Sequence, residues 1–209
     1  MTFQALIFDY GGVLEGPLNK RGFQNDLDAL AAQYGFNEGR ELWSHLYHSS
    51  AWEQAKRGQI GRDAFWIDRL SELGLDKKED RDSFIHLLHQ NRGIRPEMRT
   101  LLSELHAVCR LAILSNTARE DFSQYLAERR GLNGLFDVVI SSAEVGMAKP
   151  EPEIYLLTLE RLQLPPGDTL FIDDLSRNTK AAEQLGITSI LFTDPAQLRT
   201  ELKTHGVLR

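Results

Sequence analysis

Two acidic strand ends are the residues of this sequence best placed to do chemistry. Asp9 ends the apolar run 6–8, and Asp173 and Asp174 follow the apolar run 169–172. If these runs are neighbouring strands of a parallel sheet, their carboxyl ends bring three carboxylates to one crevice. Like charges that close repel each other, so the arrangement makes sense around a divalent cation. The pattern predicts metal-assisted chemistry with Asp9 as the attacking group.

Polar residues also follow the other apolar runs. Ser115 and Asn116 come after residues 111–114, and Lys149 lies in the segment after residues 137–140. An ordered set of an aspartate, a hydroxyl residue, a lysine and an acid pair suits phosphoryl transfer. The carboxylate attacks phosphorus, hydroxyl and backbone N–H groups bind the phosphoryl oxygens, and the lysine neutralises developing charge.

The elements that must position these residues alternate from about residue 95 onward. Short, almost continuously apolar runs are typical of parallel strands buried on both faces. Together with the run at the start of the chain, they predict strands at 3–8, 111–114, 137–140, 169–172 and 189–192. Helical patterns lie between the later runs, at 96–107, 120–130, 152–163 and 178–185. This alternation predicts βαβ units and a parallel sheet.

The segment between the first strand and its sheet partners has a different texture. It shows no strand signal and carries amphipathic helical stretches at 23–34, 38–48, 63–73 and 80–90. The simplest topology inserts these helices after the first strand. We therefore expect an α/β fold, a Rossmann-like doubly wound parallel sheet formed by residues 1–14 and 94–209. A cap of four or five helices, residues 15–93, would close over the crevice at the strand ends.

At this point the chain resembles the haloacid dehalogenase-like (HAD) superfamily over nearly its full length, in its helical-cap, phosphatase-like branch. Four motifs in order carry the resemblance: Phe8-Asp9-Tyr10-Gly11-Gly12-Val13, Leu114-Ser115-Asn116-Thr117, Lys149-Pro150 and Phe171-Ile172-Asp173-Asp174. The resemblance implies an aspartyl-phosphate on Asp9, with the phosphoryl group held by Ser115, Asn116 and Lys149. It also implies Mg²⁺ bound by Asp9, the Gly11 carbonyl and Asp174, with Asp173 close behind through water.

Gly11 is the departure from the family pattern. Most phosphatases of the superfamily carry a second Asp there, which protonates the leaving oxygen, and such help is worth roughly 10²–10⁴ in rate. Three interpretations stay open: a good leaving group such as that of a sugar-1-phosphate or an acyl phosphate, a proton from a cap residue or water, or a weak catalyst that serves as a binder. Similar family members, such as sugar-1-phosphate phosphatases and the phosphatase domain at the N-terminus of epoxide hydrolase, favour activity.

The predicted function is therefore Mg²⁺-dependent hydrolysis of a small phosphate monoester, with sugar phosphates among the candidates. One alternative is a 2-haloacid dehalogenase, which attacks carbon without a metal and usually has small polar residues in place of the acid pair. Asp173-Asp174 favours the phosphatase. The other alternative is a non-catalytic binding protein of the same fold.

Composition limits the partners. The net charge of −6 and the pI of about 5.5 argue against nucleic acid, and no apolar run approaches membrane-spanning length. A single cysteine, Cys109, and the lack of a signal-peptide pattern suit a cytoplasmic protein. We expect a small phosphorylated metabolite as the partner, Cys109 as a buried structural thiol, and a monomer or homodimer.

The predicted cap offers weaker signals. We expect its bulky aromatic residues to build the helical core, with one of them facing substrate: Trp43, Trp52, Phe65 and Trp66. A turn at Glu53, Arg57 and Gly58 is a candidate specificity loop reaching the crevice. The basic pairs 20–21 and 129–130 are interpreted as solvated charges.

Overall fold

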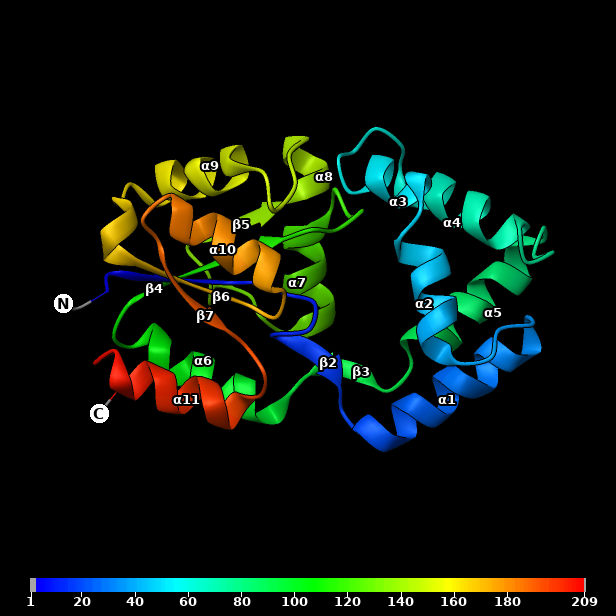
Figure 1. Cartoon of the computed structure of the whole chain (residues 1–209), viewed down its shortest axis with the longest axis horizontal. Helices are drawn as coiled ribbons and strands as arrows, with labels where there is room; N and C mark the ends of the chain where they lie inside the picture. Colours follow the sequence, from blue (N-terminus) through cyan, green and yellow to red (C-terminus); the bar gives the residue numbers. More distant parts are fainter. Residues whose placement is uncertain (1–2, 209) are drawn as a thin grey trace.

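A five-stranded parallel sheet is the centre of the structure, a computed structural model that describes residues 3–208 (Figure 1). In the order β5-β4-β1-β6-β7, its strands are β5 (Val138–Ser141), β4 (Arg110–Ser115), β1 (Ala5–Phe8), β6 (Thr169–Asp173) and β7 (Thr188–Leu191). All five are within a few residues of the predicted runs. The chain builds one half of the sheet outward from β1 and then the other, so β1 lies where the strand order reverses. Ligands bind at such points in open α/β sheets.

The register of β1 explains why its carboxyl end gathers polar residues. Phe8 pairs with Ile113 of β4 on one side and with Ile172 of β6 on the other. The residues that follow each of these three positions therefore lie at one edge of the sheet. Asp9 and Asp173 are neighbours because each comes one step after a paired residue.

Helices cover both faces of the sheet, as a doubly wound fold requires. Residues alternate along β1: Leu6 and Phe8 pack in one core cluster, whereas Ala5 and Ile7 pack in the other. The first face is covered by α6 (Pro96–His106), α7 (Phe122–Arg130) and α11 (Pro195–Thr204). The second is covered by α9 (Pro152–Leu162) and α10 (Ser176–Gln184). The short helix α8 (Ser142–Val145) and the 3₁₀ turn η1 (Pro166–Asp168) lie in connections.

Five further helices form a separate group to one side of the sheet (Figure 1). These cap helices are α1 (Lys20–Gln33), α2 (Gly39–Tyr47), α3 (Ser50–Ala55), α4 (Arg62–Ser71) and α5 (Lys78–His89). They share a hydrophobic core that is almost entirely their own, built from leucines, alanines and aromatic residues. Within residues 3–208, none of the helices is both long and apolar enough to cross a membrane.

The expectation of no strand between residues 15 and 93 is wrong at both ends of that segment. β2 (Glu15–Pro17) and β3 (Arg92–Ile94) pair antiparallel, and this two-stranded ribbon carries the chain to the cap helices and back. Each strand has three residues, and the pair includes two glycines and a proline, so no alternating apolar pattern announces it. We keep the division into residues 1–14 plus 94–209 and residues 15–93 as a proposal, with its boundaries at this ribbon.

Candidate active site

A buried lysine joins two of the predicted carboxylates. Lys149 Nζ donates to Asp9 Oδ1 and to Asp173 Oδ2, each at 2.7 Å. The exposed fractions are 8% for Asp9, 2% for Lys149 and 0% for Asp173, so this cluster is almost shut off from solvent. Asp9 follows β1, Asp173 ends β6, and Lys149 comes from the loop after α8, so three distant segments converge as the sequence predicts.

The cluster holds more negative charge than its lysine balances. Burial raises the pKa of Asp9 to about 7, with Asp173 and Asp174 adding to the rise and Lys149 opposing it. The pKa of Asp174 is also raised, by burial and then by the Asp173 charge. Burial alone would lower the pKa of Lys149, but Asp9 and Asp173 raise it. One carboxylate oxygen from each aspartate lies within 4.8 Å of the others, a spacing that suits a divalent cation.

The two adjacent aspartates of β6 do different things. Asp173 turns inward, where it accepts from the Leu175 N–H at 2.9 Å and from Asn178 Nδ2 at 2.9 and 3.0 Å. Asp174 lines the open crevice instead. Asn178 was not predicted, because a polar residue in the first turn of a helix gives no signal of a partner on another element.

Gly12 makes room for Asp174. Its φ of +92° lies in the region that favours glycine, and a Cβ there would overlap the Asp174 carboxylate. Gly11 is different: its φ is not in that region, and a Cβ would meet no atom within 4 Å. The Gly-Gly pair therefore combines a required glycine with an open position that borders the crevice.

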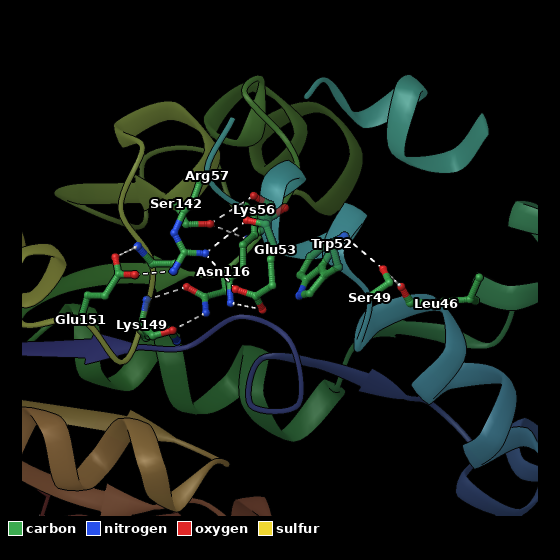
Figure 2. A network of polar contacts seen from close by, with 12 residues as sticks. Leu46, Ser49, Trp52, Glu53, Lys56, Arg57, Asn116, Ser142, Lys149 and Glu151 are labelled. Carbon is green, nitrogen blue, oxygen red and sulfur yellow. Dashed lines mark hydrogen bonds and ion pairs between the residues drawn. The ribbon is translucent and has the colours of Figure 1, made fainter. Parts of the chain in front are cut away.

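Ser115 and Asn116 lie at the end of β4, but their side chains are used differently. Ser115 is 3% exposed and lines the crevice, and its hydroxyl has no hydrogen-bond partner within residues 3–208. The Asn116 amide instead clamps the Lys149 backbone, accepting from its N–H and donating to its C=O, each at 2.9 Å (Figure 2). The Asn116 side chain thus positions Lys149, and its role as a phosphate ligand stays a prediction.

A crevice of about 1260 Å³ lies between the sheet edge and the cap helices. Its polar end includes Asp9, Ser115, Lys149 and Asp174, and the cap supplies an aromatic wall: Trp43, Tyr47, Trp52, Phe65 and Trp66. Phe65 and Trp66 are 1% and 5% exposed, so these two build the cap core. Trp43 and Trp52 are only half-buried, so two tryptophans rather than one present part of their surface.

The turn after α3 docks on the segment that carries Lys149. Arg57 pairs with Glu53 at 2.9 Å and also with Glu151, the N-cap residue of α9 (Figure 2). Gly58 has a φ of +66°, and a Cβ there would overlap the backbone carbonyl of Ala143. The turn therefore reaches the crevice as expected, together with Lys56, a buried residue that the sequence did not single out.

Arg130 and Cys109 differ in how well the structure fits what the sequence predicts for them. Interpreting Arg130 as a solvated charge is wrong, because it pairs at 2.5 Å with the buried Glu15 and lies over the Tyr125 ring. Its neighbour Arg129 is exposed, as expected. Cys109 is half-buried, and burial raises its pKa to about 11, which fits a structural thiol.

Known proteins match both the sequence and the fold. The profile of the haloacid dehalogenase-like hydrolases matches residues 3–186. This chain belongs to that family. The chain is also 32% identical to the sesquiterpene phosphatase astK of Aspergillus oryzae, and the match covers 97% of this chain and 96% of that protein.

Two further similarities extend this assignment. This chain is 39% identical to bifunctional epoxide hydrolase 2 of Rattus norvegicus. The match covers 97% of this chain but only 39% of the epoxide hydrolase. A HAD family enzyme from Bacteroides thetaiotaomicron, in complex with magnesium and inorganic phosphate, shares the fold with a TM-score of 0.71 and 23% identity. That match covers 94% of this chain and 98% of the other. The chain is an enzyme of this superfamily with phosphatases among its relatives.

Proposed function

We propose that this hydrolase is a Mg²⁺-dependent phosphatase that works through a phospho-enzyme on Asp9. The observation that carries the proposal is the buried Asp9–Lys149–Asp173 cluster, with Asp174 and Ser115 facing the same crevice. A carboxylate held by a lysine at a strand end, beside a free hydroxyl and a second acid, suits attack on a phosphoryl group. The acid pair argues against the dehalogenase alternative.

Asp9 is the proposed nucleophile. One of its oxygens attacks phosphorus, the ester P–O bond breaks, and its electron pair leaves with the ester oxygen, which takes up a proton. Water then hydrolyses the aspartyl-phosphate, which returns the carboxylate and releases inorganic phosphate. Lys149 keeps Asp9 oriented and favours its charged form, and Asn116 holds the Lys149 backbone in place.

The residues present fit a magnesium ion. Three carboxylates offer oxygens within 4.8 Å of one another, and Gly12 leaves the space that the Asp174 carboxylate fills. Asp9, Asp174 and the Gly11 carbonyl would hold the ion directly, and Asp173 through water. When bound, Mg²⁺ would supply positive charge that offsets the negative charge of the carboxylates and of the phosphoryl group. Ser115 Oγ, the Asn116 backbone N–H and Lys149 Nζ would bind those oxygens.

The organic part of the substrate is proposed to be apolar. Beyond the polar end, the crevice is walled by half-buried Trp43 and Trp52 with Tyr47 between them, and Trp43 and Trp52 each contact Tyr47 in aromatic pairs. Aromatic surface of this kind favours a hydrocarbon or ring system over a free sugar. The name of the relative astK, a sesquiterpene phosphatase, supports the same class.

The test is hydrolysis of p-nitrophenyl phosphate and of a prenyl monophosphate, with Mg²⁺ or with EDTA. Asp9→Asn should lower kcat by at least about 1,000-fold, since removing a nucleophile removes the covalent path. The exposed Asp80→Asn on α5 is the matched control and should keep wild-type turnover. Retained turnover in Asp9→Asn would refute the mechanism, and chloride release from 2-chloropropionate in EDTA would support the dehalogenase instead.

A further inference from the structure

The charged side chains that line the crevice are mostly paired within it. The cations whose carboxylate partner lies within 4 Å and also lines the crevice are Lys149 with Asp9, Arg92 and Arg130 with Glu15, and Lys56 and Arg57 with Glu53. Two half-buried arginines that line the same crevice, Arg62 and Arg119, lie outside these pairs. The proposed mechanism uses neither of them.

Arg62 is a cation in an unfavourable place. It is the first residue of α4, at the positive end of the helix dipole, where a basic side chain is destabilising. Burial lowers its pKa and the Arg119 guanidinium lowers it further, while the charges of Asp63 and Asp121 oppose this only in part. No hydrogen bond or ion pair within residues 3–208 engages its side chain, and its exposed neighbour Asp63 does not line the crevice. Local stability therefore does not explain this arginine.

Arg119 lines the crevice from the sheet domain, four residues after Ser115. Its guanidinium lies 4.0 Å from the centroid of the Tyr125 ring, a stacked position that restricts its motion. Its acidic partner Asp121 is 3.5 Å away but exposed, and does not line the crevice. The cap helices and the sheet domain thus each contribute one guanidinium to the crevice, and within residues 3–208 neither of the two has a carboxylate partner that also lines it.

We propose that Arg62 and Arg119 together bind a second anionic group of the substrate, a phosphate or a carboxylate. Planar guanidinium groups bind both anions through paired N–H donors, and an anion between them would relieve their mutual repulsion. The inference rests on the proposed phosphatase function, which assigns the first anion to the strand ends. Within residues 3–208, Asp9 is bound by Lys149 and has no hydrogen bond or ion pair with Arg62 or Arg119, so we assign the second anion to a position apart from the strand ends.

The experiment measures binding of phosphonates, which are not hydrolysed, in the presence of Mg²⁺ by titration calorimetry. The ligands are hexylphosphonate, 6-carboxyhexylphosphonate and hexane-1,6-bisphosphonate, so the organic chain stays nearly constant. The wild-type protein should bind at least one ligand with two anionic groups about 10-fold more tightly than hexylphosphonate. Comparing the carboxylate with the bisphosphonate identifies which second anion the subsite takes.

Arg62→Met and Arg119→Met, made separately, should each reduce that preference to about twofold or less. Methionine keeps the length and apolar stem of the side chain, and two variants guard against one that fails to fold. Arg161→Met, on the exposed surface of α9, is the control and should keep the full preference. Equal binding by the wild type of the ligands with one and with two anionic groups, or an unchanged preference in both variants, would overturn the subsite. Because no turnover is involved, these results are independent of the Asp9→Asn test.

Discussion

At the scale of single residues, the two glycines after Asp9 have opposite meanings. Gly12 is required, because any side chain would displace Asp174. Gly11 is not required by sterics, since a Cβ there meets open space. The position at which most phosphatases of the superfamily carry an acid is therefore available to one here. We therefore expect the residue at position 11 to affect the protonation of the leaving group and not the packing of the site.

Gly11→Asp should speed hydrolysis of alkyl phosphates, whose oxygens leave poorly without a proton. We expect kcat to rise by about 10-fold or more. General acid catalysis by a well-positioned group typically contributes about 10²–10⁴ in rate, and an engineered acid is expected to give less than that. p-Nitrophenyl phosphate should change little, because its leaving phenolate is stable without a proton. The measurement is kcat for both substrates in the variant and the wild type.

Gly11→Asn is the matched control, with the same size and no titratable proton. A rise in Gly11→Asn equal to that in Gly11→Asp would show that the gain comes from packing or polarity. No rise in Gly11→Asp would show that another group already supplies the proton.

At the scale of elements, the turn after α3 connects the cap to the catalytic loop. Gly58 lies against the Ala143 carbonyl, and the neighbouring Arg57 pairs with Glu151. Glu151 in turn accepts from the Ala148 N–H at 3.0 Å, one residue before Lys149. A displacement of this turn should therefore reach the cluster that orients Asp9.

Gly58→Ala should lower kcat/KM by about 10-fold, because the new Cβ pushes the turn away from the sheet domain and misplaces groups at the crevice. It should also lower stability by roughly 1 kcal/mol through its positive φ. Gly74→Ala is the control: its φ is +76°, but a Cβ there meets nothing within 4 Å. The control should show a similar loss of stability in thermal melts and unchanged kinetics. Equal kinetic losses in both variants would contradict a specific role for the turn.

The elements also show what could be predicted from the sequence. The five sheet strands were recognisable because continuous apolar runs follow from burial on both faces. β2 and β3 were not, because three-residue strands depend on a partner far along the chain. The same limit applies to side chains: Arg130 finds Glu15, and Asn178 finds Asp173, only after the chain has folded.

In the candidate site too, some residues were predictable from sequence patterns and others depend on how the chain folds. Asp9, Lys149 and Asp173 were predictable because motif order and strand ends place them together. The role of Asn116 as a phosphate ligand stays a prediction. The contact of its side-chain amide with the Lys149 backbone could not be predicted, since that contact depends on the path of a loop. The aromatic wall was visible in composition, but which tryptophans border the crevice depends on how α2, α3 and α4 pack.

At the scale of the whole molecule, charge must be arranged locally. The net charge of −6 repels a phosphorylated substrate, and the cluster of Asp9, Asp173 and Asp174 at the strand ends adds a local excess of carboxylates. In the proposed function, attraction comes from the Mg²⁺ that the carboxylates would hold and from Arg62, Arg119 and Lys149. Metal binding should therefore affect both substrate binding and the stability of the whole fold.

Mg²⁺ should raise the melting temperature, because it binds the folded cluster and relieves the repulsion that raises the pKa of Asp9 and Asp174. At about 100 times Kd a ligand adds about 2.7 kcal/mol, which in a chain of this size corresponds to a shift of roughly 5–10 °C. Asp174→Asn should lose most of this shift while its melting temperature in EDTA stays equal or rises, since one repelling charge is gone. Asp80→Asn, with an exposed carboxylate remote from the cluster, should keep the full shift and controls for ionic strength. If Mg²⁺ raised the melting temperature of Asp174→Asn as much as that of the wild type, the ion would bind elsewhere. An ion that does not contact Asp174 is not stabilised by the charge of that carboxylate.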